Sequence, residues 1–310
     1  MNISVLLVAL LVIFSFFVLT LRATQYASFT DVNDVDISYI ISTIKPITLP
    51  FGDTTVFPNF RYVALYGSAV YENLGALGEQ PITQSIDKAK ALANSYQPYS
   101  EKTVIPTFEI ITTVASELPT DNNDYSQETE ISRLRPWIDA AYNAGVYVLL
   151  DLQLGRSDFL TQAKEYQELL LEPHVGLALD PEWRLKKDEF HLQQIGSVSS
   201  EEVNLVSKWL ADLVQSEELP QKIFLLHQFR TSMIENRENL DTSREELGYV
   251  IQMDGQGTTA GKNDTWKAIT SNPPKNTFFG WKNFYDEDTP LRSPAETMKI
   301  RPMPYYISYQ

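Results

Sequence analysis

Acidic residues recur in this sequence late in short apolar runs, where their side chains could act together. The run VGLALDPEW, residues 175–183, carries Asp180 and Glu182 after an alternating apolar start. Successive side chains of a strand point to opposite faces, so both carboxylates share a face with the small residues Gly176 and Ala178. The bulky residues of the run occupy the other face, which suits a covering layer of helices. We therefore expect Asp180 and Glu182 to point into a crowded interior.

Three other apolar runs carry a carboxylate in the same way. The alternating face ends with Glu109 in VIPTFEII, includes Asp151 in VYVLLDLQLG and includes Asp254 in YVIQMDG. A single acidic residue at a strand end is usually a helix cap or a solvated loop residue. Several inward carboxylates are harder to explain as structure, because burying like charges costs free energy unless they are paired or protonated. The predicted catalytic residues are Glu182, Asp180, Asp151, Glu109 and Asp254.

Polar and aromatic side chains near the same positions are candidates for binding a substrate. Gln153 shares the face of Asp151, and His227 lies near the end of the run IFLLHQF. Aromatic rings near strand ends could stack on sugar faces, although ordinary packing is an equally common use of such rings. A lone histidine is more often a hydrogen-bonded structural residue than a ligand. The predicted binding residues are Tyr66, Gln153, Trp183, His227, Lys282 and Trp281.

Carboxyl groups of unequal acidity are the machinery of glycoside hydrolysis. One carboxyl group stays protonated and acts as the acid, while another is ionised and acts as base or nucleophile. Crowding of carboxylates raises one pKa and so supplies the acid. Our candidates for the acid are Glu182 and Glu109. Our candidates for the base or nucleophile are Asp180, Asp151 and Asp254.

Two other function classes remain open at this stage. Carboxylates with one histidine can hold Mg, Mn or Ca, so a divalent-metal hydrolase is the first alternative. With three histidines in the chain, a histidine-rich zinc site is not expected. The second alternative is an envelope protein that binds a glycan without cleaving it. No nucleophile elbow, phosphate-binding glycine loop or dinucleotide fingerprint occurs in the sequence. We therefore expect no cofactor, and a divalent cation is the one alternative.

The elements that must position these residues are strand-like and helix-like segments in alternation. Near-continuous apolar strands separated by helices predict a parallel sheet that is buried on both faces. Eight such units predict a closed (β/α)8 TIM barrel, whose active site lies at the carboxyl ends of the strands. The predicted strands are 62–67, 104–111, 146–155, 175–183, 223–229, 249–255, 278–285 and 305–310. The predicted helices are 82–96, 128–143, 159–171, 200–215 and 265–270.

The barrel should occupy residues 59–310, which leaves its eighth outer helix missing. Ile37, Ile40, Ile41 and Ile44 repeat at helical spacing, so we expect residues 35–44 to pack in that gap, with an extra strand as the alternative. The extension that packs on the barrel is then residues 25–58.

The first 24 residues indicate a membrane anchor. Residues 3–21 contain no charged side chain. The length of this uncharged run is close to the length that crosses the hydrocarbon of a bilayer. No convincing small-x-small cleavage site follows, so an uncleaved signal anchor is favoured over a cleaved signal. We therefore expect the protein at the cell membrane with its barrel on the extracellular side, or secreted if the segment is cleaved.

Composition narrows the possible ligands. The net charge is −15 with an isoelectric point near 4.7, which disfavours nucleic acids and anionic surfaces and favours neutral or cationic partners such as a carbohydrate. The chain has no cysteine, which excludes a disulfide framework and a thiolate nucleophile.

A resemblance covers about four-fifths of the chain, from residue 62 onward. The chain resembles a largely uncharacterised family of exported bacterial proteins of actinobacterial type, which are glycoside-hydrolase-like TIM barrels. The resemblance implies export and the barrel, and it assigns no catalytic residue. The stretches that carry it are LYGSAVYENLGALGEQ, VIPTFEIITTVAS, LRPWIDAAYNAGVYVLLDLQLGRSDFLTQAK, HVGLALDPEW, QIGSVSSEEVN, LPQKIFLLHQFR, MDGQG, FFGWKNFYDED and ISYQ.

Overall fold

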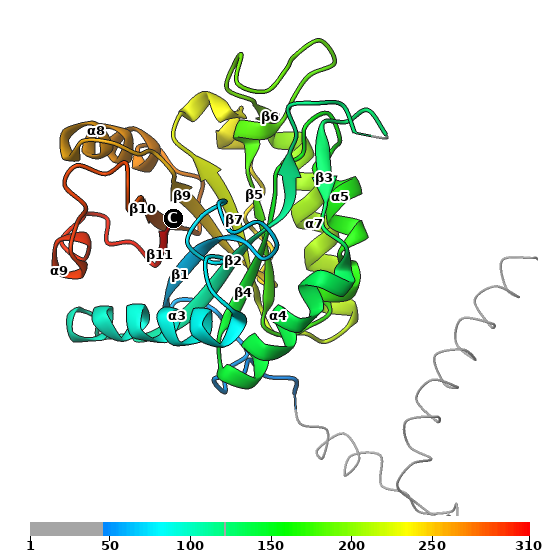
Figure 1. Ribbon diagram of the computed structural model, residues 1–310. Helices are drawn as coiled ribbons and strands as arrows, with labels where there is room; N and C mark the ends of the chain where they lie inside the picture. Colours follow the sequence, from blue (N-terminus) through cyan, green and yellow to red (C-terminus); the bar gives the residue numbers. More distant parts are fainter. Residues whose placement is uncertain (1–45, 121) are drawn as a thin grey trace, which may run out of the picture. The chain divides into compact units, whose positions relative to one another are not determined.

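The computed structural model describes residues 46–120 and 122–310. Eight parallel strands close into a barrel, in the hydrogen-bonded order β1-β11-β10-β9-β7-β5-β4-β2, with β2 pairing back to β1 (Figure 1). The predicted (β/α)8 fold is therefore confirmed. The barrel strands are β1 (Phe60–Ser68), β2 (Thr103–Ala115), β4 (Tyr147–Leu152), β5 (Val175–Leu179), β7 (Lys222–Gln228), β9 (Leu247–Met253), β10 (Thr277–Asn283) and β11 (Tyr306–Tyr309).

Helices cover the outside of the barrel between successive strands, except that β7 and β9 are joined by a loop with short 3-10 turns (Figure 1). Two of the predicted helices differ most from the structure. The predicted helix 159–171 is broken at Tyr166, whose backbone leaves the helical region, and the last predicted helix begins at Thr259 because the Thr258 side chain caps it. The helices are α3 (Ile82–Tyr96), α4 (Ile131–Ala144), α5 (Phe159–Glu165), α6 (Gln167–Leu170), α7 (Ser200–Ser216), α8 (Thr259–Thr270) and α9 (Pro294–Thr297).

Short strands and a 3-10 turn lie at the ends of the barrel strands. The strand β3 (Ser126–Glu128) runs antiparallel to the end of β2, and β6 (Val198–Ser199) pairs with β8 (Ile234–Glu235). A 3-10 turn, η2 (Pro181–Trp183), follows β5 directly. The predicted strand 175–183 therefore ends at Leu179, and the turn positions the residues after it.

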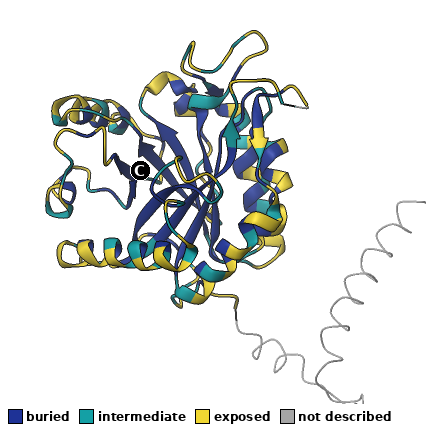
Figure 2. Cartoon of the chain, in the orientation of Figure 1, coloured by how far each residue is buried: buried dark blue, intermediate teal, exposed yellow. Residues whose placement is uncertain are grey.

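Two layers of apolar side chains pack on the two faces of the strands. Outward residues such as Phe108 and Leu177 pack against the helices, while inward residues such as Tyr147 and Leu225 fill the lumen. The barrel strands are buried over most of their length and the outer helix faces are exposed (Figure 2). The lumen leaves no room at Gly176, where a Cβ would lie 2.5 Å from the carbonyl oxygen of Ile223. A glycine is therefore required there by packing.

The amino end of the barrel is closed by residues that precede β1. Leu49, Val56 and Phe57 belong to the same apolar cluster as the lumen residues, and the Phe57 ring stacks on Phe278 with centroids 4.4 Å apart. The rest of the predicted extension, including residues 35–44, and the predicted anchor, residues 1–24, lie outside the described residues. Within residues 46–120 and 122–310, no helix is both long and apolar enough to cross a membrane.

Candidate active site

A cavity of about 670 Å³ opens at the carboxyl ends of the barrel strands. This is the end at which active sites of this fold lie. Seven of the residues predicted from the sequence line it, and aromatic side chains from neighbouring loops, Phe229 and Phe284, complete its wall. The predicted residues in the lining are Tyr66, Gln153, Asp180, Glu182, Trp183, Asp254 and Lys282.

Asp180 and Glu182 reach the cavity through the turn that ends β5. The Asp180 carboxylate caps the turn by accepting a hydrogen bond from the Glu182 backbone N–H at 3.2 Å. Pro181, between them, starts the turn with its fixed backbone angle. Strand alternation predicted the direction of Asp180, whereas Glu182 takes its position from the turn.

Glu109 and Asp151 lie below the floor of the cavity. Both side chains are completely buried and neither lines the cavity. One carboxylate oxygen of each residue accepts a hydrogen bond from a tyrosine. The Tyr306 hydroxyl donates to Glu109 Oε2 at 3.1 Å, and the Tyr66 hydroxyl donates to Asp151 Oδ2 at 2.9 Å. The sequence placed both carboxylates among the catalytic candidates; the structure places them underneath, where they support the groups above.

His227 lies below the floor as well, between three carboxylates. Its Nδ1 is 2.9 Å from Asp254 Oδ2, and its Nε2 is 2.9 Å from Glu109 Oε1 and 3.6 Å from Asp151 Oδ1. Burial lowers the pKa of His227, but the charges of Asp151 and Asp254 outweigh burial and raise the pKa well above its ordinary value. The ring is therefore an imidazolium that supplies a fixed positive charge, and it is not positioned to contact a substrate.

Asp254 is kept ionised by two cationic neighbours. Its Oδ2 faces His227, and its Oδ1 lies 3.1 Å from Lys282 Nζ. Burial acts to raise the pKa of Asp254, yet the charges of Lys282 and His227 lower it below its ordinary value. Lys282 itself is held over the face of Tyr66, with Nζ 3.5 Å from the ring centroid. Two cations thus fix both oxygens of Asp254 and keep it charged.

Three carboxyl groups around Asp254 behave in the opposite way. Burial, together with the charge of Asp254, raises the pKa of Glu182 to about 7. Burial raises the pKa of Asp180 well above its ordinary value and that of Asp151 to about 6. These groups are poorer in cationic partners than Asp254, so each keeps its proton to a higher pH than Asp254 does, although Asp151, with a pKa of about 6, is mostly ionised at pH 7. The cavity therefore holds Glu182, which keeps its proton to about pH 7, together with the ionised Asp254.

Trp281 is not part of the cavity, which corrects its prediction as a binding residue. Its side chain is fully buried on the outer face of β10, where its ring lies 5.5 Å from that of Trp266. Its indole N–H donates to Asn283 Oδ1 at 2.9 Å. Because neighbouring side chains of a strand alternate, Lys282 on the inner face requires Trp281 on the outer face.

Some residues of the site carried no usable signal in the sequence. Arg230 lines the cavity from the loop after β7, and Tyr306 supports Glu109 from the start of β11. Strand alternation stops at a strand end and so could not give the direction of Arg230. Tyr306 starts a short strand whose inward face the sequence alone did not identify.

The carboxylates of the mouth do not form a metal centre. Within residues 46–120 and 122–310, no group of three or more histidine and acidic side chains is arranged to hold a metal ion. The donor set explains this, because the oxygens of Asp254 face Lys282 and His227, and those of Glu109 face His227 and Tyr306. A metal ion would have to displace these cations and hydroxyl groups.

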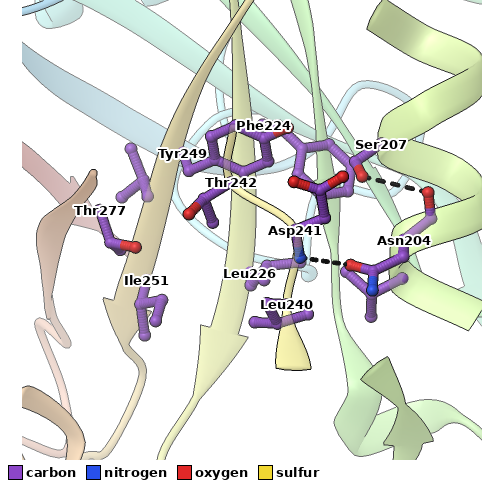
Figure 3. A pocket seen from close by; sticks show the side chains of 12 residues that line it. Asn204, Ser207, Phe224, Leu226, Leu240, Asp241, Thr242, Tyr249, Ile251 and Thr277 are labelled. Carbon is purple, nitrogen blue, oxygen red and sulfur yellow. Dashed lines mark hydrogen bonds between the residues drawn. The ribbon is translucent and has the colours of Figure 1, made fainter. Parts of the chain in front are cut away.

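A small apolar cavity lies elsewhere, between α7 and the outer faces of β7 and β9 (Figure 3). It encloses about 10 Å³, which is about enough for one water molecule. Asn204 closes one side by accepting a hydrogen bond from the Asp241 backbone N–H at 2.8 Å. Its walls are mainly apolar core residues such as Phe224 and Leu226, so it is a gap in packing and not a candidate site.

Comparisons with known proteins find matches among solved structures alone. No family model and no curated protein matches the chain. Among solved structures 22 chains match, including a GH5-4 broad-specificity endoglucanase from Clostridium longisporum. That enzyme is 11% identical, the match covers 81% of this chain and 86% of that chain, and the TM-score is 0.41. At these values the likeness carries no argument about function, and the fold stands on the strand pairing described above.

Proposed function

We propose that this protein is a glycoside hydrolase that acts at the barrel mouth, with Glu182 as the general acid and Asp254 as the base or nucleophile. The observation that supports this most strongly is the pair of opposed carboxyl groups in one cavity. Asp254 is kept ionised by Lys282 and His227, while Glu182 keeps its proton to about pH 7. Glycosidic bond cleavage needs both states at the same pH.

The surrounding residues suit the two roles. The protonated Glu182 can donate its proton to the leaving oxygen as the glycosidic bond breaks. Asp254 presents a negative charge to the sugar carbon that becomes positive in the oxocarbenium-like transition state, and its two cationic partners hold it in place. Asp180 fixes the turn that carries Glu182, so its role is one of positioning.

The mouth suits a neutral or cationic glycan. The chain carries a net charge of −15, so an anionic polymer is repelled. Trp183, Phe229 and Phe284 offer aromatic surface beside the carboxylates, as sugar rings require for stacking. We place the protein outside the cell, acting on an envelope or extracellular glycan and attached through residues 1–24 or released if that segment is cleaved.

The direct test is hydrolysis of a glycan panel by the soluble barrel. Neutral and cationic polysaccharides should release new reducing ends, at the same rate with and without EDTA. Hydrolysis that EDTA abolishes would favour a divalent-metal hydrolase instead. Saturable binding without any release of reducing ends would favour a glycan-binding protein and contradict the proposal.

A further inference from the structure

A second cavity of about 380 Å³ adjoins the mouth and shares three of its wall residues, Glu182, Trp183 and Arg230. Its other walls come from residues 191–195, in the long loop that leads from the turn η2 to β6. This loop stands at the top of Figure 1, beside β6. The two cavities therefore meet at the residue proposed as the acid.

We infer that the second cavity is the binding site for the leaving-group side of a neutral sugar chain. The inference rests on the proposed function and extends it to the kind of substrate. Asp254 lines only the larger cavity, so the sugar whose ring carbon it faces lies there. Glu182 lies between the two cavities and protonates the leaving oxygen, so the departing sugar extends to its other side.

The loop that builds this wall is folded back onto the acid-bearing turn. The Gly196 N–H donates to the Glu182 carbonyl oxygen at 2.8 Å. A Cβ at Gly196 would lie 2.4 Å from the Arg184 carbonyl oxygen and 2.5 Å from those of Glu182 and Pro181. Only glycine permits this close return of the chain. The loop therefore begins and ends at the catalytic turn.

The loop is also fastened to its neighbours along its length. The Arg156 guanidinium lies 4.3 Å from the Tyr125 ring centroid and 5.0 Å from that of Phe190, and it donates to the Glu189 carbonyl oxygen at 3.0 Å. His191 Nε2 contacts the Tyr125 carbonyl oxygen at 3.1 Å. A wall held by so many contacts exists before the ligand binds, which reduces the entropy lost on binding.

The chemistry of the second cavity suits an uncharged sugar. Trp183 and His191 form an aromatic wall, with ring centroids 5.5 Å apart. Burial lowers the pKa of His191, so the neutral form of the ring is favoured. Leu192, with 84% of its surface exposed, and Gln193 add an apolar contact and an amide at the rim. Such a mixture of aromatic surface and amide groups binds the faces and hydroxyl groups of sugars.

The test compares substrates that differ only on the leaving-group side. The probes are neutral chito- and cello-oligosaccharides of two to six units and the 4-nitrophenyl glycosides of the same sugars. Gln193→Ala removes an amide from the second cavity. Gln256→Ala, another exposed glutamine, removes one from the rim of the larger cavity alone and is the matched control.

We expect kcat/KM of the wild type to rise with oligosaccharide length. Gln193→Ala should lower kcat/KM for oligosaccharides by about three- to tenfold, the effect of one lost hydrogen bond, relative to its value for the nitrophenyl glycoside. Gln256→Ala should change both substrates by the same factor. Equal effects of Gln193→Ala on both substrates would overturn this inference and leave the glycosidase proposal intact. Failure of the wild type to cleave any probe would overturn the glycosidase proposal, and this inference with it.

Discussion

Replacing Glu182 by glutamine should make the protein more stable at alkaline pH while it strongly lowers activity. The pKa of Glu182 is about 7 in the folded protein against an ordinary value of 4.5. The difference of about 2.5 pKa units, at about 1.36 kcal/mol per unit, corresponds to at most about 3.4 kcal/mol of destabilisation when the carboxyl group ionises. The glutamine side chain of the Glu182→Gln variant would keep the shape of the protonated glutamate without ever ionising.

The sign of the pH dependence follows from the raised pKa. Below pH 4.5 Glu182 is protonated in both the folded and the unfolded state, so the wild type and Glu182→Gln should unfold at the same temperature. The destabilisation grows between pH 4.5 and about 7 and is complete above. At pH 8 the variant should therefore melt higher, by up to roughly 10 °C, because each kcal/mol moves the Tm of a domain of this size by about 2–4 °C.

Circular dichroism melts at pH 4, 6 and 8 measure this, with Glu287→Gln as the control. Glu287 lines the same cavity but is exposed, so its neutralisation should change the Tm little at any pH. The turnover of Glu182→Gln should fall by about 10²–10⁴-fold. A variant that is less stable than the wild type at pH 8, or a gain that is equal at all pH values, would refute the reasoning.

Three further changes test separate parts of the site. Lys282→Met removes a cation from Asp254, so the pKa of Asp254 should rise and the acidic limb of the kcat/KM profile should move to higher pH. Asp180→Asn should leave the urea-measured stability equal or higher, because burial raises the pKa of Asp180 and so disfavours its charged form. It should lower kcat by disturbing Glu182; lower stability with full activity would contradict this. Trp281→Leu should lower the free energy of unfolding in urea by about 2–5 kcal/mol and leave kcat/KM unchanged. Lost activity at equal stability would show that Trp281 belongs to the site.

Strand alternation predicted which face a residue occupies, but not its depth in the barrel. It placed Asp180, Asp254 and Lys282 correctly at the mouth. Glu109 and Asp151 share that inner face, yet they do not line the cavity, because the strand register pairs Glu109 with Tyr66 and the tyrosine hydroxyl groups hold their oxygens beneath it. Register depends on the pairing of distant strands, which one sequence does not reveal.

The remaining errors come from local geometry that ends a regular pattern. Glu182 lies in a 3-10 turn and not in a strand, so its agreement with strand alternation does not explain its position. Trp281 was chosen for its ring chemistry, although the same alternation that turns Lys282 inward turns Trp281 outward. The loop after Trp183 forms a cavity wall through its return at Gly196, a contact that no periodicity in the sequence predicts.

The most direct test of the account is the protonation state of the two opposed carboxyl groups. Titration of the carboxyl carbon chemical shifts by NMR reports it without a substrate, with the signals assigned through Glu182→Gln and Asp254→Asn. We predict that Glu182 titrates near pH 7 and that Asp254 stays ionised to below its ordinary pKa of 3.8. Titration of Glu182 near 4.5, or of Asp254 at a higher pH than Glu182, would contradict the assignment of acid and base.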